Sequence, residues 1–210
     1  RDWSSDVCSS DLSEILVVAD GTCDPVYVAA DLLSQAEHDV LAAAVLITDS
    51  MALAEAVRDE LDRQLSLLPR EAIARASIEN NGKLIVTDDL PAAVAAANAL
   101  APEHLELCMD DPAPYLDLVQ NAGSVFLGKY CPEALGDYLA GPNHTLPTAG
   151  AARFSSPLSV EDFVKKTQYT CFTPAALRAV SGDIALFARQ EGLEGHARSA
   201  LVRFDKEVIA

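Results

Sequence analysis

The chain has 210 residues, of which half are apolar, with a formal net charge of −17 and a pI of about 4.4. These values fit one large domain, or one domain with a smaller appendage, built on a real apolar core. Because an acidic surface repels phosphate groups, nucleic acid and anionic membranes are both disfavoured as partners.

The sequence has no segment typical of export or of a membrane span. Its apolar runs are shorter than the roughly 18–20 residues that cross a bilayer, and no charged stretch followed by an apolar one opens the chain. The five cysteines are scattered and form no CxxC pair, which argues against a disulfide framework and a cysteine zinc knuckle. We therefore expect a cytoplasmic protein with no membrane partner.

Residues 1–12 differ in character from the rest of the chain. The stretch RDWSSDVCSSDL holds the one tryptophan and shows neither helical nor strand periodicity. We expect it to be a disordered tail or an artefact of how the sequence was obtained.

Strands and helices alternate in the segment that follows. Short bounded apolar runs predict buried strands, and Asp or Ser before an apolar stripe predicts the start of a helix. The predicted strands are Glu14–Ala19, Val40–Thr48, Lys83–Thr87 and Ser124–Leu127. The predicted helices begin at Asp24-Pro25, with Val26, Ala29, Ala30, Leu33 and Ala36 buried; at Ser50, with a stripe from Leu53 to Leu68; and at Asp88 or Asp89, ending at Leu100.

This alternation predicts an α/β fold with a mostly parallel, Rossmann-like sheet and helices on both faces. The pattern changes from about Ser159, where one short strand (Gln168–Phe172) precedes two helices, Thr173–Glu191 and Glu194–Val208. We expect an α/β domain over residues 13–158 and a small helical C-terminal appendage over residues 159–210.

Side chains that can bind a metal ion recur along the chain. Gln35 and His38 are spaced i, i+3 at the end of the first helix, so both can reach one ion. Asp137 lies seven residues before His144 in a turn-rich segment, and His196 falls in the first turn of the last helix. A set of Gln, His, Asp and His contains no thiolate, which suits an accessible Zn²⁺ site that a substrate can also bind.

Glu103 and His104 are adjacent in APEHLE, which follows a helix that must end near its proline. Two bases of different pKa in one loop can take a proton from an alcohol and activate a water. A structural Glu-His pair on the surface would look the same, and for any histidine taken alone a structural role is the better interpretation.

Seven segments in order resemble histidinol dehydrogenases and cover essentially all of Ser13–Ala210. They are SEILVVAD, ADLLSQAEHD, APEHLEL, AGSVFLG, ALGDYLAGPNHTLPT, LSVEDF and EGLEGHAR. The resemblance implies that Gln35, His38, Asp137 and His196 bind zinc and that Glu103 and His104 are the catalytic bases. It also implies substrate contacts from Ser13, Gln35, His38, His104, Asp137, Glu191 and His196, with His144 close to the site.

The activity that the resemblance implies is the oxidation of L-histidinol through histidinal to L-histidine, the last step of histidine biosynthesis, with two NAD⁺ used in sequence. His104 would accept the alcohol proton, Glu103 would activate water to hydrate the aldehyde, and zinc would orient the substrate. The family is a homodimer in which the C-terminal appendage completes the partner's site, so Glu191 and His196 would serve the neighbouring site.

The sequence departs from the family mainly in length. The family's chain is roughly twice as long, so its N-terminal half would be missing before Ser13. Asp11-Leu12 stand where the family has Gly-Pro, and Asp39 after the metal histidine is a mild variation. The chain has no GxGxxG loop, so the NAD contacts are expected in the missing half.

Two other classes of function remain open at this point. A zinc hydrolase could use Glu103 and a metal-bound water, and it would turn over without nicotinamide. A non-catalytic acidic binding or scaffold module would use its histidines for structure alone and would hold no stoichiometric zinc.

Overall fold

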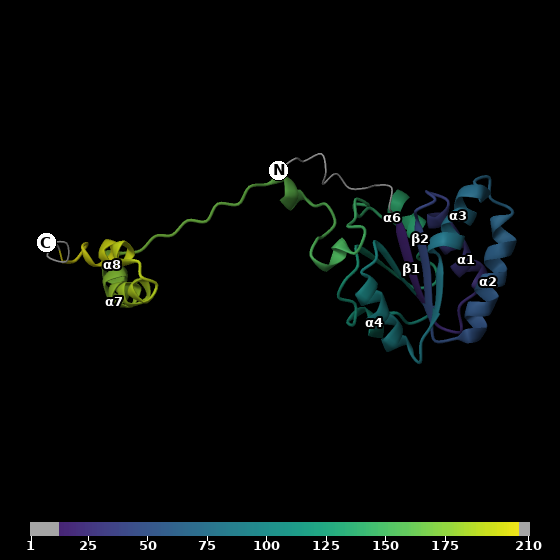
Figure 1. Cartoon of the computed structure of the whole chain (residues 1–210), viewed down its shortest axis with the longest axis horizontal. Coiled ribbons are helices and arrows are strands. Elements are labelled where there is room, and N and C mark those ends of the chain that lie inside the picture. The colour runs from purple at the N-terminus through teal and green to yellow at the C-terminus, as the bar shows by residue number, and fades with distance from the viewer. Residues whose placement is uncertain (1–12, 206–210) are drawn as a thin grey trace. The chain divides into compact units, whose positions relative to one another are not determined.

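The computed structural model describes residues 13–205, which form two compact units (Figure 1). The first unit ends at Phe163 and the second begins at Val164. The predicted tail, residues 1–12, and the last residues of the final predicted helix lie outside the described residues.

The first unit consists of a five-stranded sheet and its flanking helices. The strands are β1 (Glu14–Ala19), β2 (Ala43–Thr48), β3 (Lys83–Val86), β4 (His104–Cys108) and β5 (Ser124–Leu127). The helices are α1 (Pro25–Ala36), α2 (Met51–Leu65), α3 (Glu71–Asn81), α4 (Leu90–Leu100), α5 (Ala113–Leu116) and α6 (Glu133–Tyr138), followed by the 3₁₀ helices η1 (Ala151–Arg153) and η2 (Val160–Phe163).

The sheet is parallel throughout, in the order β3-β2-β1-β4-β5. The side chains of the central strand β1 alternate between two apolar clusters: Ile15 and Val17 pack with α1 and α2, and Leu16 and Val18 pack with α4. Figure 1 shows these helices on opposite faces of the sheet. The predicted α/β fold, with helices on both faces, is confirmed.

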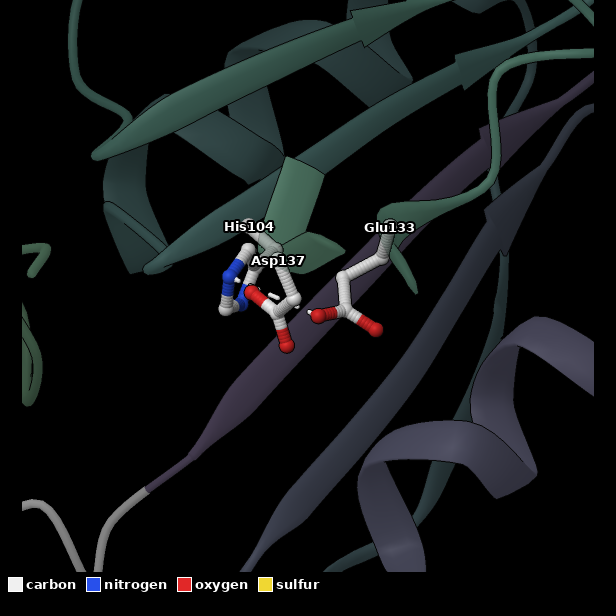
Figure 2. Close-up of side chains that lie close together, drawn as sticks. All are labelled: His104, Glu133 and Asp137. Carbon is white, nitrogen blue, oxygen red and sulfur yellow. Dashed lines mark ion pairs between the residues drawn. The ribbon is translucent and has the colours of Figure 1, made fainter. Parts of the chain in front are cut away.

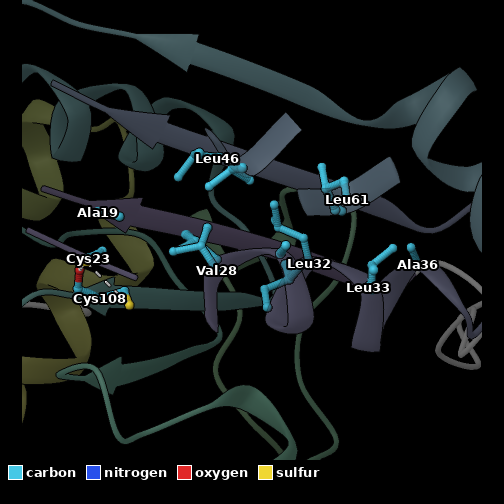
Figure 3. Packing of buried hydrophobic residues seen from close by; sticks show 14 of the residues in the cluster. Ala19, Cys23, Val28, Leu32, Leu33, Ala36, Leu46, Leu61 and Cys108 are labelled. Carbon is cyan, nitrogen blue, oxygen red and sulfur yellow. Dashed lines mark hydrogen bonds between the residues drawn. The ribbon is translucent and has the colours of Figure 1, made fainter. Parts of the chain in front are cut away.

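The cluster on the α1 face includes two cysteines (Figure 3). Cys23 and Cys108 are free thiols whose sulfur atoms lie 3.8 Å apart, and both are buried. They join the loop after β1 to the end of β4 by packing and by a hydrogen bond that the Cys23 thiol donates to the Cys108 carbonyl.

Three helices begin at the predicted capping residues. The Asp24 carboxylate accepts a hydrogen bond from the Val26 N–H at 2.9 Å, and the Ser50 hydroxyl accepts one from Leu53 at 3.2 Å. Asp89, the second of the two candidates for α4, accepts from Ala92 at 2.8 Å. These bonds satisfy N–H groups that have no partner inside the helix, which is why the helices begin here.

The buried face of α1 differs in part from the predicted one. Val28 and Leu32 are buried, whereas Val26 is 41% exposed and Ala30 is exposed. Apolar residues occupy most positions of this helix, so the pattern alone did not fix its orientation. The observed orientation buries Gln35 at 1% exposure.

Several boundaries and elements in the first unit were predicted wrongly. β2 begins at Ala43 rather than Val40, because Asp39 holds a turn by accepting from the Leu41 N–H at 2.8 Å. Helix α3 was not predicted; it buries few side chains, so its pattern is weak. His104 is not in a loop: it opens β4, which was missed because His104 and Glu106 interrupt the apolar run.

The end of α4 leads directly into β4. Ala101 follows the helix with a left-handed backbone (φ 55, ψ 61) and donates its N–H to the carbonyl of Ala97 at 2.8 Å. Pro102 cannot continue a helix. This reversal places Glu103 and His104 at the amino end of β4, beside β1.

The second unit contains α7 (Pro174–Gln190) and α8 (Glu194–Leu201), which pack through Ala185, Ala188 and Ala197. The predicted strand Gln168–Phe172 is not formed; its residues are exposed, and none of the residues described in this unit offers a neighbouring strand. α8 ends at Leu201, before the predicted Val208. No helix in the described part of the chain is long and apolar enough to cross a membrane.

Candidate functional site

The amino ends of β1 and β4 border a polar cavity of about 210 Å³. The parallel register sets Ile15 beside His104, so the residues that open the two strands are neighbours. The lining residues are Ser13, Gln35, His38, Glu103, His104, Asp137, His144, Thr145, Leu146 and Thr148. Seven of the nine predicted site residues are therefore brought to one cavity, and the other two, Glu191 and His196, lie in the second unit.

The backbone of the neighbouring strand β1 holds the imidazole ring of His104 in place. Its Nδ1 lies 3.0 Å from the carbonyl oxygen of Glu14 and 3.1 Å from Nε2 of Gln35. The carbonyl can only accept a hydrogen bond, so it partners the tautomer with a proton on Nδ1. The amide nitrogen can only donate one, so it partners the tautomer in which Nδ1 has no proton. Burial lowers the pKa of His104. A neutral imidazole can accept a proton or bind a metal.

Glu103 lies next to His104 and is 8% exposed. Its Oε2 accepts a hydrogen bond from the Glu14 N–H at 3.0 Å and lies 3.5 Å from Nδ1 of His104. Burial raises the pKa of Glu103 to about 7. A carboxyl group that titrates near neutral pH is well matched to general-base work.

Helix α6 contributes two carboxylates to the cavity region. Glu133 and Asp137 are spaced i, i+4 on one face of the helix, and their oxygens and a ring nitrogen of His104 all lie within 4.8 Å of one another (Figure 2). Burial, followed by the nearby Asp137, raises the pKa of Glu133 to about 8. Oxygen and imidazole donors without a thiolate suit a divalent cation such as Zn²⁺.

More buried polar groups lie behind α6. Glu106 is 2% exposed, and its Oε1 accepts a hydrogen bond from the Glu133 N–H at 2.7 Å. Burial raises the pKa of Glu106 and raises that of its neighbour Asp31, on α1, to about 6. Ser34 donates to Oε2 of Glu133 at 3.2 Å. A chain of carboxyl groups therefore runs from the cavity towards α1.

Sequence reasoning missed Glu133, Glu106 and Asp31. Two of them carried a signal that could be used: Glu106 is two residues after His104, on the same face of a strand, and Glu133 is one helical turn before Asp137. Neither signal was visible while His104 was assigned to a loop and α6 was not predicted.

Comparison with known proteins decides the family. A family model described as histidinol dehydrogenase matches residues 7–204. The chain belongs to the histidinol dehydrogenase family. Curated histidinol dehydrogenases include that of Streptococcus mutans, 57% identical over 194 residues, covering 92% of this chain and 45% of that protein. That of Geobacter sulfurreducens is 54% identical over 191 residues, covering 91% and 44%.

The fold of this histidinol dehydrogenase family member matches a solved structure. The crystal structure of histidinol dehydrogenase from Elizabethkingia anophelis superposes with a TM-score of 0.86 at 38% identity, covering 94% of this chain and 45% of that chain. The chain therefore spans just under half the length of the relatives that it matches.

Two overlapping sets of side chains in the first unit have the donors that zinc needs. Gln35, His38 and Asp137 line the cavity together, and His104, Glu133 and Asp137 converge beside it. Both sets combine oxygen and imidazole nitrogen, and Oε1 of Glu133 is a buried acceptor with no hydrogen-bond partner. A cation would satisfy that oxygen, so the residues present fit the metal that the resemblance implies.

Proposed function

We propose that this chain supplies the zinc ligands and the general bases of an NAD-linked oxidoreductase that converts L-histidinol through histidinal to L-histidine. The observation that carries the proposal is the cavity at the amino ends of β1 and β4, where both bases and three of the four implied zinc ligands meet. Family membership supports the same activity. The whole reaction needs more of the protein than this chain, which spans about 45% of its relatives.

His104 takes the proton of the substrate alcohol in this proposal. The buried ring is neutral, and its two tautomers each have a partner at Nδ1, so either nitrogen can hold the proton without a change of ring position. With the alcohol proton removed by His104, a bound NAD⁺ would supply the hydride acceptor that the oxidation needs. General-base catalysis of this kind contributes typically about 10²–10⁴-fold.

Glu103 activates water in the second half of the reaction. Its pKa of about 7 leaves a substantial fraction ionised at neutral pH, and this fraction can take a proton from water as the water adds to the aldehyde. Oxidation of the resulting hydrate to the acid would need a base at the site to take one hydroxyl proton and a second NAD⁺ to accept the hydride. The two bases thus serve two different steps although they are adjacent in the chain.

Gln35, His38, Asp137 and His196 are the proposed zinc ligands. When bound, the ion supplies a positive charge that can hold the nitrogen atoms of the substrate. Ser13, Glu191 and the ligand side chains would contact the substrate, and His144 lies in the same cavity wall. The resemblance supports a homodimer in which Glu191 and His196 of one chain complete the site of its partner.

The nicotinamide contacts and the location in the cell belong to the proposal as well. The sequence contains no GxGxxG loop, so we assign the NAD contacts to the part of the relatives that the match leaves out. The protein would work in the cytoplasm with a small-molecule substrate, as suits an acidic biosynthetic enzyme.

A chimera tests the proposal. Residues 13–210 are joined to the part of the Streptococcus mutans relative that the match leaves out, and NADH formation is followed by absorbance with L-histidinol, NAD⁺ and zinc. We expect turnover that a chelator removes and zinc restores. Hydrolysis of test esters or amides without nicotinamide would favour a hydrolase instead, and a folded chimera without zinc or turnover would contradict the proposal.

A further inference from the structure

Glu133 is a buried carboxylate that the family resemblance leaves without a role. It is 2% exposed, and its Oε1 has no hydrogen-bond partner in the structure. An unsatisfied buried carboxylate oxygen is costly, at about 1–3 kcal/mol or more. Native structures seldom keep such a group unless a ligand, an ion or a water satisfies it.

The direction of the side chain shows what kind of ligand would satisfy it. Oε1 of Glu133 lies 3.7 Å from Nε2 of His104, and an oxygen of Asp137 completes a triangle whose sides are all within 4.8 Å (Figure 2). With its proton on Nδ1, donated to the Glu14 carbonyl, His104 presents a lone pair at Nε2. In this tautomer, with both carboxyl groups ionised, three acceptors face one point, and a single cation would satisfy all three.

The spacing suits one metal ion. Two ligand atoms of a tetrahedral zinc ion with bonds of about 2.1 Å lie roughly 3.4 Å apart, close to the 3.7 Å between Nε2 of His104 and Oε1 of Glu133. Other contacts hold the carboxylate in place: the Glu133 N–H donates to Glu106 at 2.7 Å, and Ser34 donates to Oε2 at 3.2 Å. Fixing of a ligand by its neighbours is typical of metal sites.

We propose that His104, Glu133 and Asp137 form a holding site for Zn²⁺ within the first unit, distinct from the catalytic ligand set and sharing Asp137 with it. This inference rests on the proposed function for the assignment of Asp137 as a zinc ligand. An ion held here needs no residue of the second unit. An ion held here would also block Nε2 of His104 as a base. Catalysis would then need the ion at the proposed catalytic ligands Gln35, His38, Asp137 and His196 instead.

The test measures zinc affinity of the 210-residue chain by competition with a chromogenic chelator. The variants are Glu133→Gln, His196→Ala and Asp137→Asn. Glu37→Gln is the matched control, because Glu37 is a carboxylate at the end of α1 that does not line the cavity. We expect Glu133→Gln and Asp137→Asn each to weaken binding at least about ten-fold. His196→Ala and Glu37→Gln should stay within about two-fold of the parent chain.

Three results would overturn part or all of this. Parent-like zinc affinity of Glu133→Gln would remove the holding site. Loss of zinc in both His196→Ala and Asp137→Asn, with Glu133→Gln unaffected, would remove the holding site and leave the proposed catalytic ligands standing. Parent-like affinity in all three variants would remove both. Circular dichroism checks folding, and if Glu133→Gln unfolds, Glu133→Asp replaces it, with a smaller expected loss because the charge is kept but withdrawn by one methylene.

Discussion

The two edges of the sheet in the first unit use acidic residues in opposite ways. At the amino edge, Glu103 and Glu133 are buried, and burial raises the pKa of each. At the carboxyl edge, Asp24 and Asp89 are exposed and accept hydrogen bonds from the first turns of α1 and α4. The same residue types are therefore candidates for chemistry at one edge and cap helices at the other.

The fold alone would have directed attention to the edge opposite the candidate site. In open α/β sheets, ligands usually bind beyond the carboxyl ends of the strands where the strand order reverses, here between β1 and β4. There Lys129 links the segments that follow β1 and β4: it pairs with Asp110 at 3.0 Å and donates to the Thr22 carbonyl at 3.1 Å. The residue types, and not the fold class, locate the cavity.

The largest expected effect concerns the 210-residue chain alone. The carboxyl edge is acidic and has no phosphate-binding loop, so it offers no binding site for the nicotinamide. Positioning of the hydride donor and acceptor can lower the activation barrier by about 7–11 kcal/mol. We expect little or no histidinol-dependent NADH formation with zinc and NAD⁺ present. A rate close to that of the chimera would show that this edge binds the dinucleotide after all.

The next effect separates the two bases at the amino edge. In the chimera, His104→Asn should slow oxidation of L-histidinol by about 10²–10⁴-fold, because the alcohol proton loses its acceptor. Glu103→Gln should mainly slow oxidation of supplied histidinal, because only that step needs an activated water. Asp24→Asn at the other edge is the control and should change neither rate. Equal losses in both half-reactions for both variants would contradict this division.

A smaller effect on stability comes from the partly buried Asp31. Burial raises its pKa to about 6 in the folded state, above the roughly 3.9 of an unfolded chain. The protonated form thus stabilises the fold fully below about pH 4, and this contribution is lost as the pH rises through 6. Asp31→Asn cannot ionise, so its free energy of unfolding, relative to the parent, should improve by about 2 kcal/mol from pH 4 to pH 7.

Urea denaturation of the parent chain and of Asp31→Asn, each at pH 4 and at pH 7, measures this difference in the free energy of unfolding. Asp24→Asn serves as the control, since Asn also caps helices and Asp24 is exposed. If Asp31→Asn and Asp24→Asn show the same pH dependence, burial does not perturb Asp31.

The smallest effect tests the capping role of the carboxyl edge. Asp89→Ala removes the acceptor for the Ala92 N–H and should lower the free energy of unfolding by about 1 kcal/mol, whereas Asp89→Ser should retain most of it. Thermal or urea unfolding measures both variants. A loss of zinc affinity or activity in Asp89→Ala, beyond this loss of stability, would mean that the two edges are not separate in function.

Much of the fold followed from local signals in the sequence. β1, the starts of α1, α2 and α4, and the helices of the second unit rest on capping residues and apolar periodicity, which act over a few residues. β4 could not be found in this way. Its stability comes from two neighbouring strands rather than from its own composition, so His104 and Glu106 hid a strand that is buried at every position.

Sequence motifs that resemble a family led to most residues of the candidate site, but they gave no access to features that contacts between distant segments create. Gln35 and His104 are 69 residues apart in the chain, yet their side chains are in contact at 3.1 Å. Glu133 shows the limit most clearly: its carboxylate stands out only after folding has buried it and left one oxygen without a partner. Burial and the lack of a hydrogen-bond partner are properties of the fold, and a single sequence gives little indication of either.

The backbone conformation and the burial of Ala101 limit which residues can occupy this position just before the candidate site. Its left-handed backbone costs an L-residue about 1–2 kcal/mol, and its side chain is completely buried. Glycine would relieve the strain at the cost of a freer unfolded chain, and any larger residue would meet both the strain and a lack of room. We therefore expect related sequences to have only alanine or glycine at position 101. We also expect this residue, Pro102, Glu103 and His104 to be retained together.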